Sequence, residues 1–205
     1  MFDKELRNLT YGLFVLSGES DGKASGAIIN TAIQVTDTPL KMAICVNKSG
    51  YTGELIRKSR KFSLSILDEN ADFEIFRHFG FQSGRDVDKW AGWDHKEKGP
   101  DGLYHITQGA NAWISCEVDE EIDLGSHIMF IAFIRDAGIL SDVPSASYTY
   151  YHAHIKPKPE AKKEEGRPAW RCTICGYIYE GADLPADFIC PWCKHPASDF
   201  EPIRI

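Results

Sequence analysis

The sequence lacks several features that would assign it to a particular class of protein. No apolar run approaches the ~20 residues of a membrane-spanning helix. Acidic residues precede any apolar stretch at the N-terminus, so no secretory signal peptide is predicted. Basic residues are not in excess, because 23 Lys and Arg stand against 30 Asp and Glu, and nucleic acid is not an expected partner. These absences favour a cytoplasmic globular protein whose 205 residues allow a medium-sized domain and a small one.

Cysteine is scarce and unevenly placed. The chain has six cysteines, and four of them fall within residues 172–193. Cys45 and Cys116 stand alone in the apolar segments MAICV and WISCEV, where a cysteine is usually a small buried hydrophobic residue. Without an export signal disulfides are not expected, and the spacing of the clustered four is typical of metal ligands.

Composition divides the chain into two predicted domains. Residues 155–166 read IKPKPEAKKEEG, with two prolines, seven charged residues and no aromatic residue. Such a segment cannot bury apolar surface, so it is interpreted as a linker. It separates a predicted domain of residues 1–154 from one of residues 167–205.

The larger domain is predicted to be mainly β. Five segments rich in β-branched or aromatic residues are predicted strands: YGLFVLSG, KMAICVN, KFSLSIL, AWISCEV and HIMFIAFI. Short helices are predicted at residues 71–79, where three phenylalanines share one side, and in the segment TGELIRKS. No G-x-G-x-x-G follows a strand, which disfavours a Rossmann unit. We expect a sheet-rich barrel with a few peripheral helices.

The clustered cysteines, Cys172, Cys175, Cys190 and Cys193, follow the pattern C-x2-C-x14-C-x2-C. Each C-x2-C pair forms a tight knuckle, and two knuckles complete a tetrahedron of sulfur that suits either iron or zinc. A segment this short barely forms a core, so the ion must supply much of its folding free energy. Six aromatic residues surround the ligands in the sequence: Trp170, Tyr177, Tyr179, Phe188, Trp192 and Phe200. They would keep water from an iron centre, and the alternative is that they form the core of a zinc ribbon.

The segment of residues 167–203 resembles rubredoxin. The resemblance rests on CTICGYIYEG, on LPADFICPWC and on a phenylalanine seven residues after the last cysteine. The interval between the two cysteine pairs is short, and is similar to that of the rubredoxin domain of rubrerythrin. The resemblance implies a one-electron Fe(III)/Fe(II) centre. Lys194 and His195 follow the second pair, either as ordinary surface charge or as contacts for a docking partner.

Residues 1–154 resemble the flavin reductase-like, FMN-binding split-barrel domain. Five segments occur in the order of that family: LTYGLFVL, GAIINTAIQVTDTP, ICVNKSGYTGELI, HFGFQSGRDVDKW and DLGSHIMFIAFI. Such a domain followed by rubredoxin is similar to the high-molecular-weight rubredoxins of anaerobic bacteria. Members of that family pass electrons from NADH to a flavodiiron protein, and split barrels of this kind are usually homodimers with FMN at the subunit interface.

The resemblance also implies a set of flavin-binding residues. The phosphate of FMN needs backbone amides and hydroxyls, and often a cation. The residues that match the family's flavin-binding positions are Asn30, Thr31, Asn47, Lys48, Ser49, Tyr51, Thr52, Phe81, Ser83 and Arg85. By residue type alone, however, residues 47–52 are equally a polar turn, and residues 85–88 are equally a solvated helix start.

His127 is the candidate catalytic residue, because the family places a histidine at this strand start, near the flavin and the nicotinamide. A lone histidine at such a position is more often structural. Asp88 and Lys89 match a family Asp-Lys pair near the site. The tyrosines and His152 of SASYTYYHAHIK are weaker candidates at the mouth of the site, and are equally explained as a strand with one buried face.

Electron counting gives the expected mechanism. NADH delivers two electrons as a hydride and a single iron accepts one, whereas FMN accepts two and releases them singly. We therefore expect NAD(P)H-dependent reduction of FMN, transfer to iron, and transfer to an acceptor such as a flavodiiron oxygen or nitric oxide reductase. Two alternatives remain: an FMN- and iron-containing carrier that another protein reduces, and a structural zinc ribbon on a ligand-binding barrel.

Overall fold

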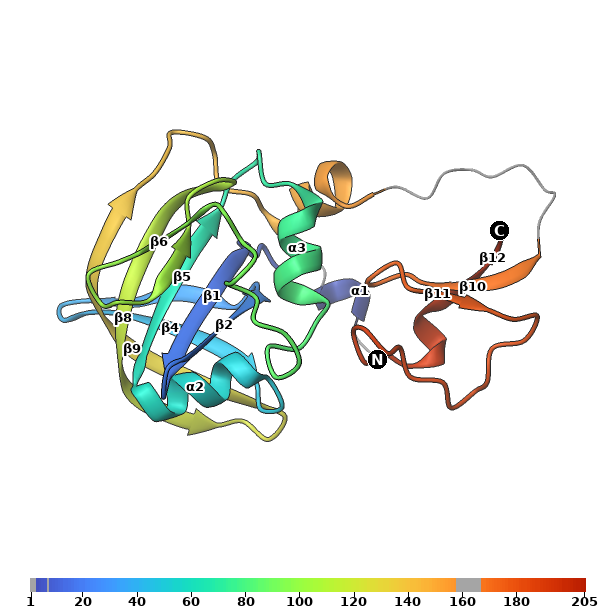
Figure 1. Ribbon diagram of the computed structural model, residues 1–205, viewed down its shortest axis with the longest axis horizontal. Helices are drawn as coiled ribbons and strands as arrows, with labels where there is room; N and C mark the ends of the chain where they lie inside the picture. The colour runs from blue at the N-terminus through green and yellow to red at the C-terminus, as the bar shows by residue number, and fades with distance from the viewer. Residues whose placement is uncertain (1–2, 7, 158–166) are drawn as a thin grey trace. The chain divides into compact units, whose positions relative to one another are not determined.

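Figure 1 shows the computed structural model, which describes residues 3–6, 8–157 and 167–205. The chain forms two compact units, divided between Lys156 and Pro157. Each unit has its own sheet and its own buried residues.

The first unit is built on a seven-stranded sheet in the order β2-β1-β5-β8-β9-β4-β3, and every neighbouring pair is antiparallel. A separate hairpin pairs β6 with β7. The bounds of these strands are β1 (Phe14–Ser20), β2 (Lys23–Ile29), β3 (Ala32–Asp37), β4 (Leu40–Asn47), β5 (Lys61–Leu67), β6 (Lys96–Lys98), β7 (Tyr104–Ile106), β8 (Ala110–Asp123) and β9 (His127–Ile139).

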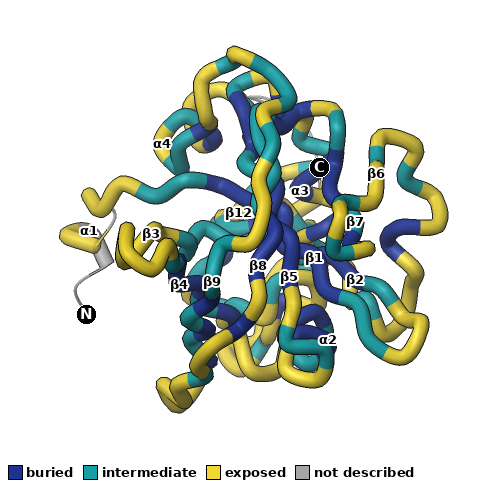
Figure 2. Tube along the Cα trace, turned by 90° about the vertical axis from the view of Figure 1, so that its left-hand side faces the viewer, coloured by how far each residue is buried: buried dark blue, intermediate teal, exposed yellow. Residues whose placement is uncertain are grey.

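The strands of the large sheet surround one apolar core. β1 and β5 are nearly continuous runs of buried residues, the pattern of strands that are covered on both faces. Ile44, Phe62 and Phe130 are completely buried in this core, and burial of one such side chain contributes about 1.5–3 kcal/mol. Figure 2 shows the buried residues along β1 and β5, whereas β3, at the edge of the sheet, is exposed over almost its whole length.

Two short helices pack beside the sheet. α2 (Tyr51–Ser59) buries Leu55 and Ile56 and packs against β1 and β2. α3 (Phe73–Gly80) begins after Asp72, whose side chain accepts a hydrogen bond from the backbone N–H of Glu74 and so caps the helix. The buried face of α3 joins a second apolar cluster, which also contains Trp90 and Tyr151. A four-residue helix, α1 (Asp3–Leu6), precedes the sheet.

The structure confirms the predicted fold class of this unit. The five predicted strands are present as β1, β4, β5, β8 and β9, and the two predicted helices as α2 and α3. In the part of the chain that the structure describes, the longest helix is α2 with nine residues, and no helix is long and apolar enough to cross a membrane.

The strand interpretation of residues 145–156 is wrong. This segment forms α4 (Tyr148–Tyr150), which continues into the π-helical turn η1 (Tyr151–Ile155). The helix starts here because the Ser147 hydroxyl accepts a hydrogen bond from the backbone N–H of Tyr150. The Tyr151 ring then packs on Phe76 of α3, with ring centroids 4.4 Å apart.

The predicted linker begins at residue 155, but Ile155 is the last residue of η1 and packs against the second apolar cluster. This contact is hidden in the sequence, because Ile155 is directly followed by proline- and charge-rich sequence. Residues 158–166 of the predicted linker lie outside the described residues.

The second unit contains a three-stranded antiparallel sheet in the order β11-β10-β12. Its elements are β10 (Pro168–Cys172), β11 (Ile178–Glu180), the 3-10 helix η2 (Ala197–Asp199) and β12 (Phe200–Arg204). Five of its described residues are buried, and three of these are cysteines: Ala169, Cys172, Cys175, Cys190 and Phe200. The interior of this unit is therefore mostly its four-cysteine cluster.

Candidate metal centre and cofactor site

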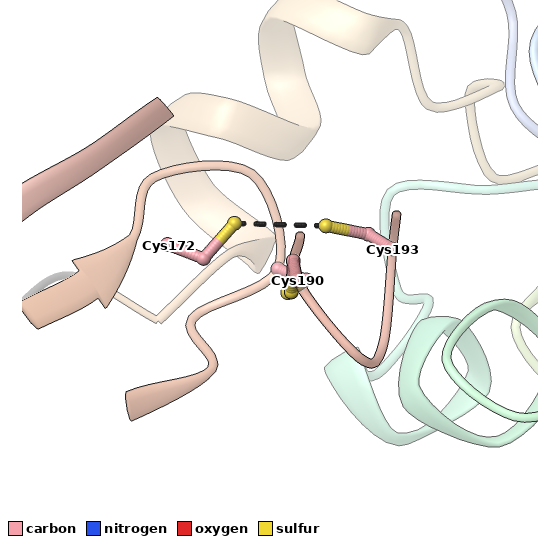
Figure 3. Close-up of side chains that lie close together, drawn as sticks. Cys172, Cys190 and Cys193 are labelled. Carbon is pink, nitrogen blue, oxygen red and sulfur yellow. Dashed lines mark hydrogen bonds between the residues drawn. The ribbon is translucent and has the colours of Figure 1, made fainter. Parts of the chain in front are cut away.

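The four clustered cysteines point their sulfur atoms into one space. All four Sγ atoms lie within 4.8 Å of one another. The Cys172 and Cys193 sulfurs, which face each other in Figure 3, are 3.5 Å apart, and those of Cys175 and Cys190 are 3.4 Å apart. Four ligands at about 2.3 Å from a central ion form a tetrahedron with edges of about 3.8 Å. The sulfur cluster therefore fits one tetrahedral metal ion.

The first knuckle, which joins Cys172 and Cys175, is shaped by backbone hydrogen bonds. The N–H of Gly176 donates to the Cys172 carbonyl (2.9 Å), and the Cys172 N–H donates to the Tyr177 carbonyl (2.8 Å). Gly176 has φ +82°, a left-handed conformation that glycine adopts without steric cost. The turn directs the Tyr177 N–H at the Cys175 sulfur, where its hydrogen bond favours the thiolate.

The second knuckle, which joins Cys190 and Cys193, repeats this arrangement. The Lys194 N–H donates to the Cys190 carbonyl (2.9 Å), and the Cys190 N–H donates to the His195 carbonyl (2.8 Å). The His195 N–H hydrogen-bonds to the Cys193 sulfur. Here, however, the left-handed position is held by Lys194, with φ +62°.

Two of the four clustered cysteines, Cys175 and Cys193, favour the neutral thiol when no cation is bound. Burial raises the pKa of the Cys175 thiol to about 12 and also raises the pKa of Cys193. At neutral pH these two sulfurs would hold protons rather than negative charge. A bound metal cation reverses that preference because it stabilises thiolates directly.

Aromatic rings of the same unit pack against one another. Phe188 contacts Tyr179 at 4.8 Å and Phe200 at 5.4 Å between centroids, and Tyr177 meets Trp192 edge-on at 5.3 Å. The remaining member of the predicted aromatic set, Trp170, donates its indole N–H to the Ala182 carbonyl at 3.2 Å. Cys193 is only partly buried, and its neighbour Trp192 is 47% exposed, so the second knuckle is the more accessible one.

In the first unit, the predicted residues 47–52 form the turn from β4 into α2. The Asn47 side-chain carbonyl accepts hydrogen bonds from the Ser49 N–H (2.9 Å) and hydroxyl (2.8 Å). Gly50 is the N-cap of α2 and has no side chain to bond the N–H groups of the first turn. These N–H groups and the positive end of the α2 dipole follow Lys48 directly in the chain. The Lys48 ammonium pairs with Asp123 at 2.7 Å.

The predicted segment 83–85 meets the same turn. The Arg85 guanidinium pairs with Glu54 of α2 at 2.9 Å and lies over the Tyr51 ring, 5.0 Å from its centroid. The hydrogen bond from Arg85 lowers the pKa of the Glu54 carboxyl. Tyr51 and Arg85 line a cleft of about 380 Å³, which is also lined by Ser20, Asp21, Lys23, Glu54, Leu55 and Lys58.

The other predicted cofactor residues lie on neighbouring elements. Asn30 and Thr31 join β2 to β3, and the Thr31 hydroxyl donates to the Cys45 carbonyl of β4 at 2.6 Å. Phe81 ends α3, with its ring edge-on to Phe73 at 5.9 Å. These three residues do not line the cleft that Tyr51 and Arg85 share.

His127 starts β9 directly opposite Asn47 of β4 in the strand register. It is exposed, and its Nδ1 lies 2.9 Å from the Ser126 hydroxyl. The Ser126 carbonyl accepts a hydrogen bond from the Lys48 N–H at 3.1 Å. The fold therefore brings the candidate catalytic residue to the predicted loop 47–52, across two strands that are distant in the sequence.

Ser25 of β2 contacts two segments that carry predicted cofactor residues, and it was not itself predicted from the sequence. It is 1% exposed, and its hydroxyl accepts a hydrogen bond from Thr52 at 3.1 Å. A Cβ added to Gly84 would lie 2.1 Å from the Ser25 Oγ, so the 83–85 segment closes tightly on β2. The sequence gives no local signal for this contact, because one serine in the middle of a strand looks like any other.

Lys89, the partner of Asp88 in the predicted pair, is buried rather than free in the site. It is 4% exposed, and its ammonium donates to the carbonyls of Gly26 (2.8 Å) and Phe79 (2.7 Å). Burial lowers the pKa of Lys89 to about 8. The Lys89 side chain fixes the segment that carries Ser83 and Arg85 against β2 and the end of α3.

Comparison with known proteins covers both units. The family profile described as a flavin reductase like domain matches residues 6–158, and the profile of the rubredoxin-like domain of rubrerythrin matches residues 170–201. The high molecular weight rubredoxin of Moorella thermoacetica is 31% identical over 230 residues, which cover 99% of this chain and 100% of that protein. The ferric-chelate reductase (NAD(P)H) of Archaeoglobus fulgidus is 34% identical over 150 residues, 73% of this chain and 88% of that protein.

Solved structures share the fold of the first unit. The NADH:FAD oxidoreductase of Streptomyces globisporus, in complex with NAD and FAD fragments, superposes with a TM-score of 0.65 at 20% identity, over 78% of this chain and 93% of that one. At this identity the likeness concerns the fold alone.

Proposed function

The chain belongs to the flavin reductase-like family, with a rubredoxin-like domain after the flavin reductase-like one, and on this premise we propose that it passes electrons from NAD(P)H through FMN to iron. It is an oxidoreductase of flavin-mediated electron transfer. One observation carries the proposal: a tetrahedral four-sulfur cluster and a flavin reductase-like fold occur in the same chain. The proposed final acceptor is a flavodiiron oxygen or nitric oxide reductase.

The turn before α2 is the proposed phosphate site. The free N–H groups of the first turn of α2, the Ser49 hydroxyl and the Lys48 ammonium offer the donors and charge that a phosphate needs. Lys48 and Arg85 are paired with acidic side chains at exposed positions. Exposed ion pairs contribute only about 0–1 kcal/mol, so both cations can exchange these partners for a phosphate at little cost.

The flavin ring has proposed contacts on either side of that turn. Asn30 and Thr31 offer hydrogen-bonding groups at the end of β2, and Phe81 and Ser83 offer an apolar edge and a hydroxyl after α3. His127 is proposed to contact the flavin and the nicotinamide, because it is exposed beside the 47–52 loop. Its role would be to orient the two rings by hydrogen bonding.

The bound flavin supplies the conversion between a two-electron donor and a one-electron acceptor. The protein's own residues bind and orient the cofactor and exclude water from the sulfur cluster. Cys172, Cys175, Cys190 and Cys193 would hold the iron. The rings of Tyr177, Tyr179, Phe188 and Phe200 pack together in the same small unit and would keep water from it. No side chain needs to accept or donate a proton for transfer to the iron.

The proposed assembly is a homodimer. Ile33, Val35 and Leu40, on and beside the edge strand β3, are 66%, 42% and 43% exposed. Exposed apolar residues on an edge strand favour association with another chain. The predicted linker would raise the local concentration of the rubredoxin-like domain at a flavin to about millimolar, whether that flavin is in its own subunit or in the partner.

The proposed location is the cytoplasm. No disulfide joins any of the six cysteines, all of which lie in the part of the chain that the structure describes. Cysteines that stay unpaired, four of them as proposed metal ligands, suit a reducing compartment.

The decisive experiment is an anaerobic visible spectrum of the native protein, titrated with NADH and with NADPH. The proposal predicts loss of both flavin and ferric absorbance, with iron rather than zinc by elemental analysis. A Cys190→Ser variant, which lacks one ligand, should still lose its flavin absorbance but show no iron signal. A flavin-loaded protein that neither nucleotide reduces, but that a separate reductase does, would establish the alternative of a carrier. A zinc-only, flavin-free protein would refute both.

A further inference from the structure

The two knuckles share one backbone geometry but carry different residues at one equivalent position. Gly176 and Lys194 both follow the second cysteine of a pair, and each donates its N–H to the carbonyl of the first cysteine at 2.9 Å. Both have positive φ, +82° and +62°. A lysine in this conformation carries a steric penalty that glycine does not. A Cβ added at Gly176 would meet nothing within 4 Å. Steric hindrance by neighbouring atoms therefore does not explain why the first knuckle has glycine at this position and the second has lysine.

The side chain of Lys194 is directed onto its own knuckle. Its ammonium donates a hydrogen bond to the carbonyl of Pro191, at 3.1 Å, between the two ligands Cys190 and Cys193. The other basic side chains of the unit for which carboxylate partners are seen are Arg171, which pairs with Glu201, and His195, whose ring lies against Asp199. Among the described residues, Lys194 has no carboxylate partner, so its positive charge is not neutralised locally.

The charge of the cluster changes when it accepts an electron. Four thiolates and Fe(III) carry a net charge of −1, and addition of one electron without a proton gives Fe(II) and a net charge of −2. A fixed neighbouring cation stabilises the more negative state more strongly. It therefore raises the reduction potential of the iron.

From this geometry we propose that Lys194 is an electrostatic tuning residue, whose ammonium favours the reduced iron and so draws electrons from the reduced flavin. This inference rests on the proposed function for the identity of the metal. It explains why a residue with an unfavourable backbone conformation occupies the accessible knuckle, beside the partly buried Cys193. The group that gives up the electron is the reduced flavin, and the iron is the group that is reduced.

The test is a potentiometric titration of the iron absorbance in the full chain, with dithionite and redox mediators in place of NAD(P)H. Protein that fails to oxidise NAD(P)H still gives a midpoint potential, so failure of this inference is separable from failure of the proposed function. The variants are Lys194→Gln and Lys194→Gly, which remove the charge, and Lys194→Arg, which keeps it. The matched control is Arg167→Gln, because Arg167 is exposed and precedes Cys172 by five residues, about 16 Å along an extended strand.

We expect the midpoint potential to fall in Lys194→Gln and Lys194→Gly and to stay near the wild-type value in Lys194→Arg and Arg167→Gln. The difference between wild type and Lys194→Gln should shrink as ionic strength rises, because salt screens an exposed charge. Lys194→Gly should also resist denaturant better than Lys194→Gln, since both lack the charge and only glycine relieves the backbone. An unchanged potential in Lys194→Gln, or an equal fall in Arg167→Gln, would overturn the inference.

Discussion

The rubredoxin-like unit should unfold when it loses its metal while the first unit stays folded. Among the residues of this unit that the structure describes, five are buried: three are proposed metal ligands, and the other two are Ala169 and Phe200. Burial of that phenylalanine contributes about 1.5–3 kcal/mol, whereas metal binding contributes about 10–16 kcal/mol in small structural sites. The first unit has a large apolar core that contains no part of the cluster.

Amide hydrogen exchange, read by mass spectrometry on the full chain, measures this directly. After the metal is removed by chelation, or in Cys190→Ser, peptides from β10, β11 and β12 should lose their protection. Peptides from β1 and β5 should keep it. Cys45→Ser is the control, because Cys45 is a half-buried thiol of the first unit that lies outside the cluster.

Persistence of protection in β10–β12 without metal would refute this reasoning, since the unit would then be stable on its apolar contacts alone. Joint loss of protection in β1 and β5 would also refute it. That result would mean that the two units unfold as one.

Three further predictions concern the first unit. Gly84→Ala should weaken flavin binding by at least about fivefold in a fluorescence titration without unfolding the protein. Its Cβ would lie 2.1 Å from the Ser25 Oγ, and relief of such overpacking costs about 1–3 kcal/mol; unchanged affinity would place the flavin elsewhere. The pKa of Lys89 is lowered to about 8 in the folded state, so the unfolded chain binds more protons between about pH 8 and pH 10 and stability should rise over that range. Denaturant unfolding should show this rise, up to roughly 3 kcal/mol, in wild type and not in Lys89→Met; equal slopes would contradict it. Burial raises the pKa of the Cys116 thiol to about 12, so iodoacetamide at pH 8 should leave Cys116 unmodified in the folded protein, as peptide mapping would reveal.

The elements of the fold that the sequence predicted are those with a strong periodic or compositional signal. Long β-branched and aromatic runs identified β4, β5 and β9, and phenylalanines at helical spacing identified α3. The tyrosine-rich segment 145–156 misled the prediction because aromatic residues favour strands. The cap at Ser147 and the packing of Tyr151 on α3 outweigh that preference.

The two candidate sites also differ in how far the sequence alone could predict them. The sequence predicted the four cysteines whose sulfur atoms the structure brings together, because each knuckle is a local turn and the spacing of its cysteines fixes its geometry. It identified many of the proposed flavin contacts only through resemblance, residue by residue. It gave no indication that Ser25, Thr52 and Gly84 meet, because that contact joins residues from three separate elements.

By itself, the sequence determined the four-sulfur cluster and the mainly β character of the first unit, since both follow from short-range patterns of residue type. The tertiary structure alone decided the burial of Lys89 between two backbone carbonyls, the closure of the 83–85 segment on β2, and the pairing of Arg85 with Glu54. It also decided the left-handed conformation of Lys194 over its own knuckle. The contacts of Lys89, of the 83–85 segment and of Arg85 depend on distances between segments that pack only after the chain has folded, and no local pattern of residues encodes such distances.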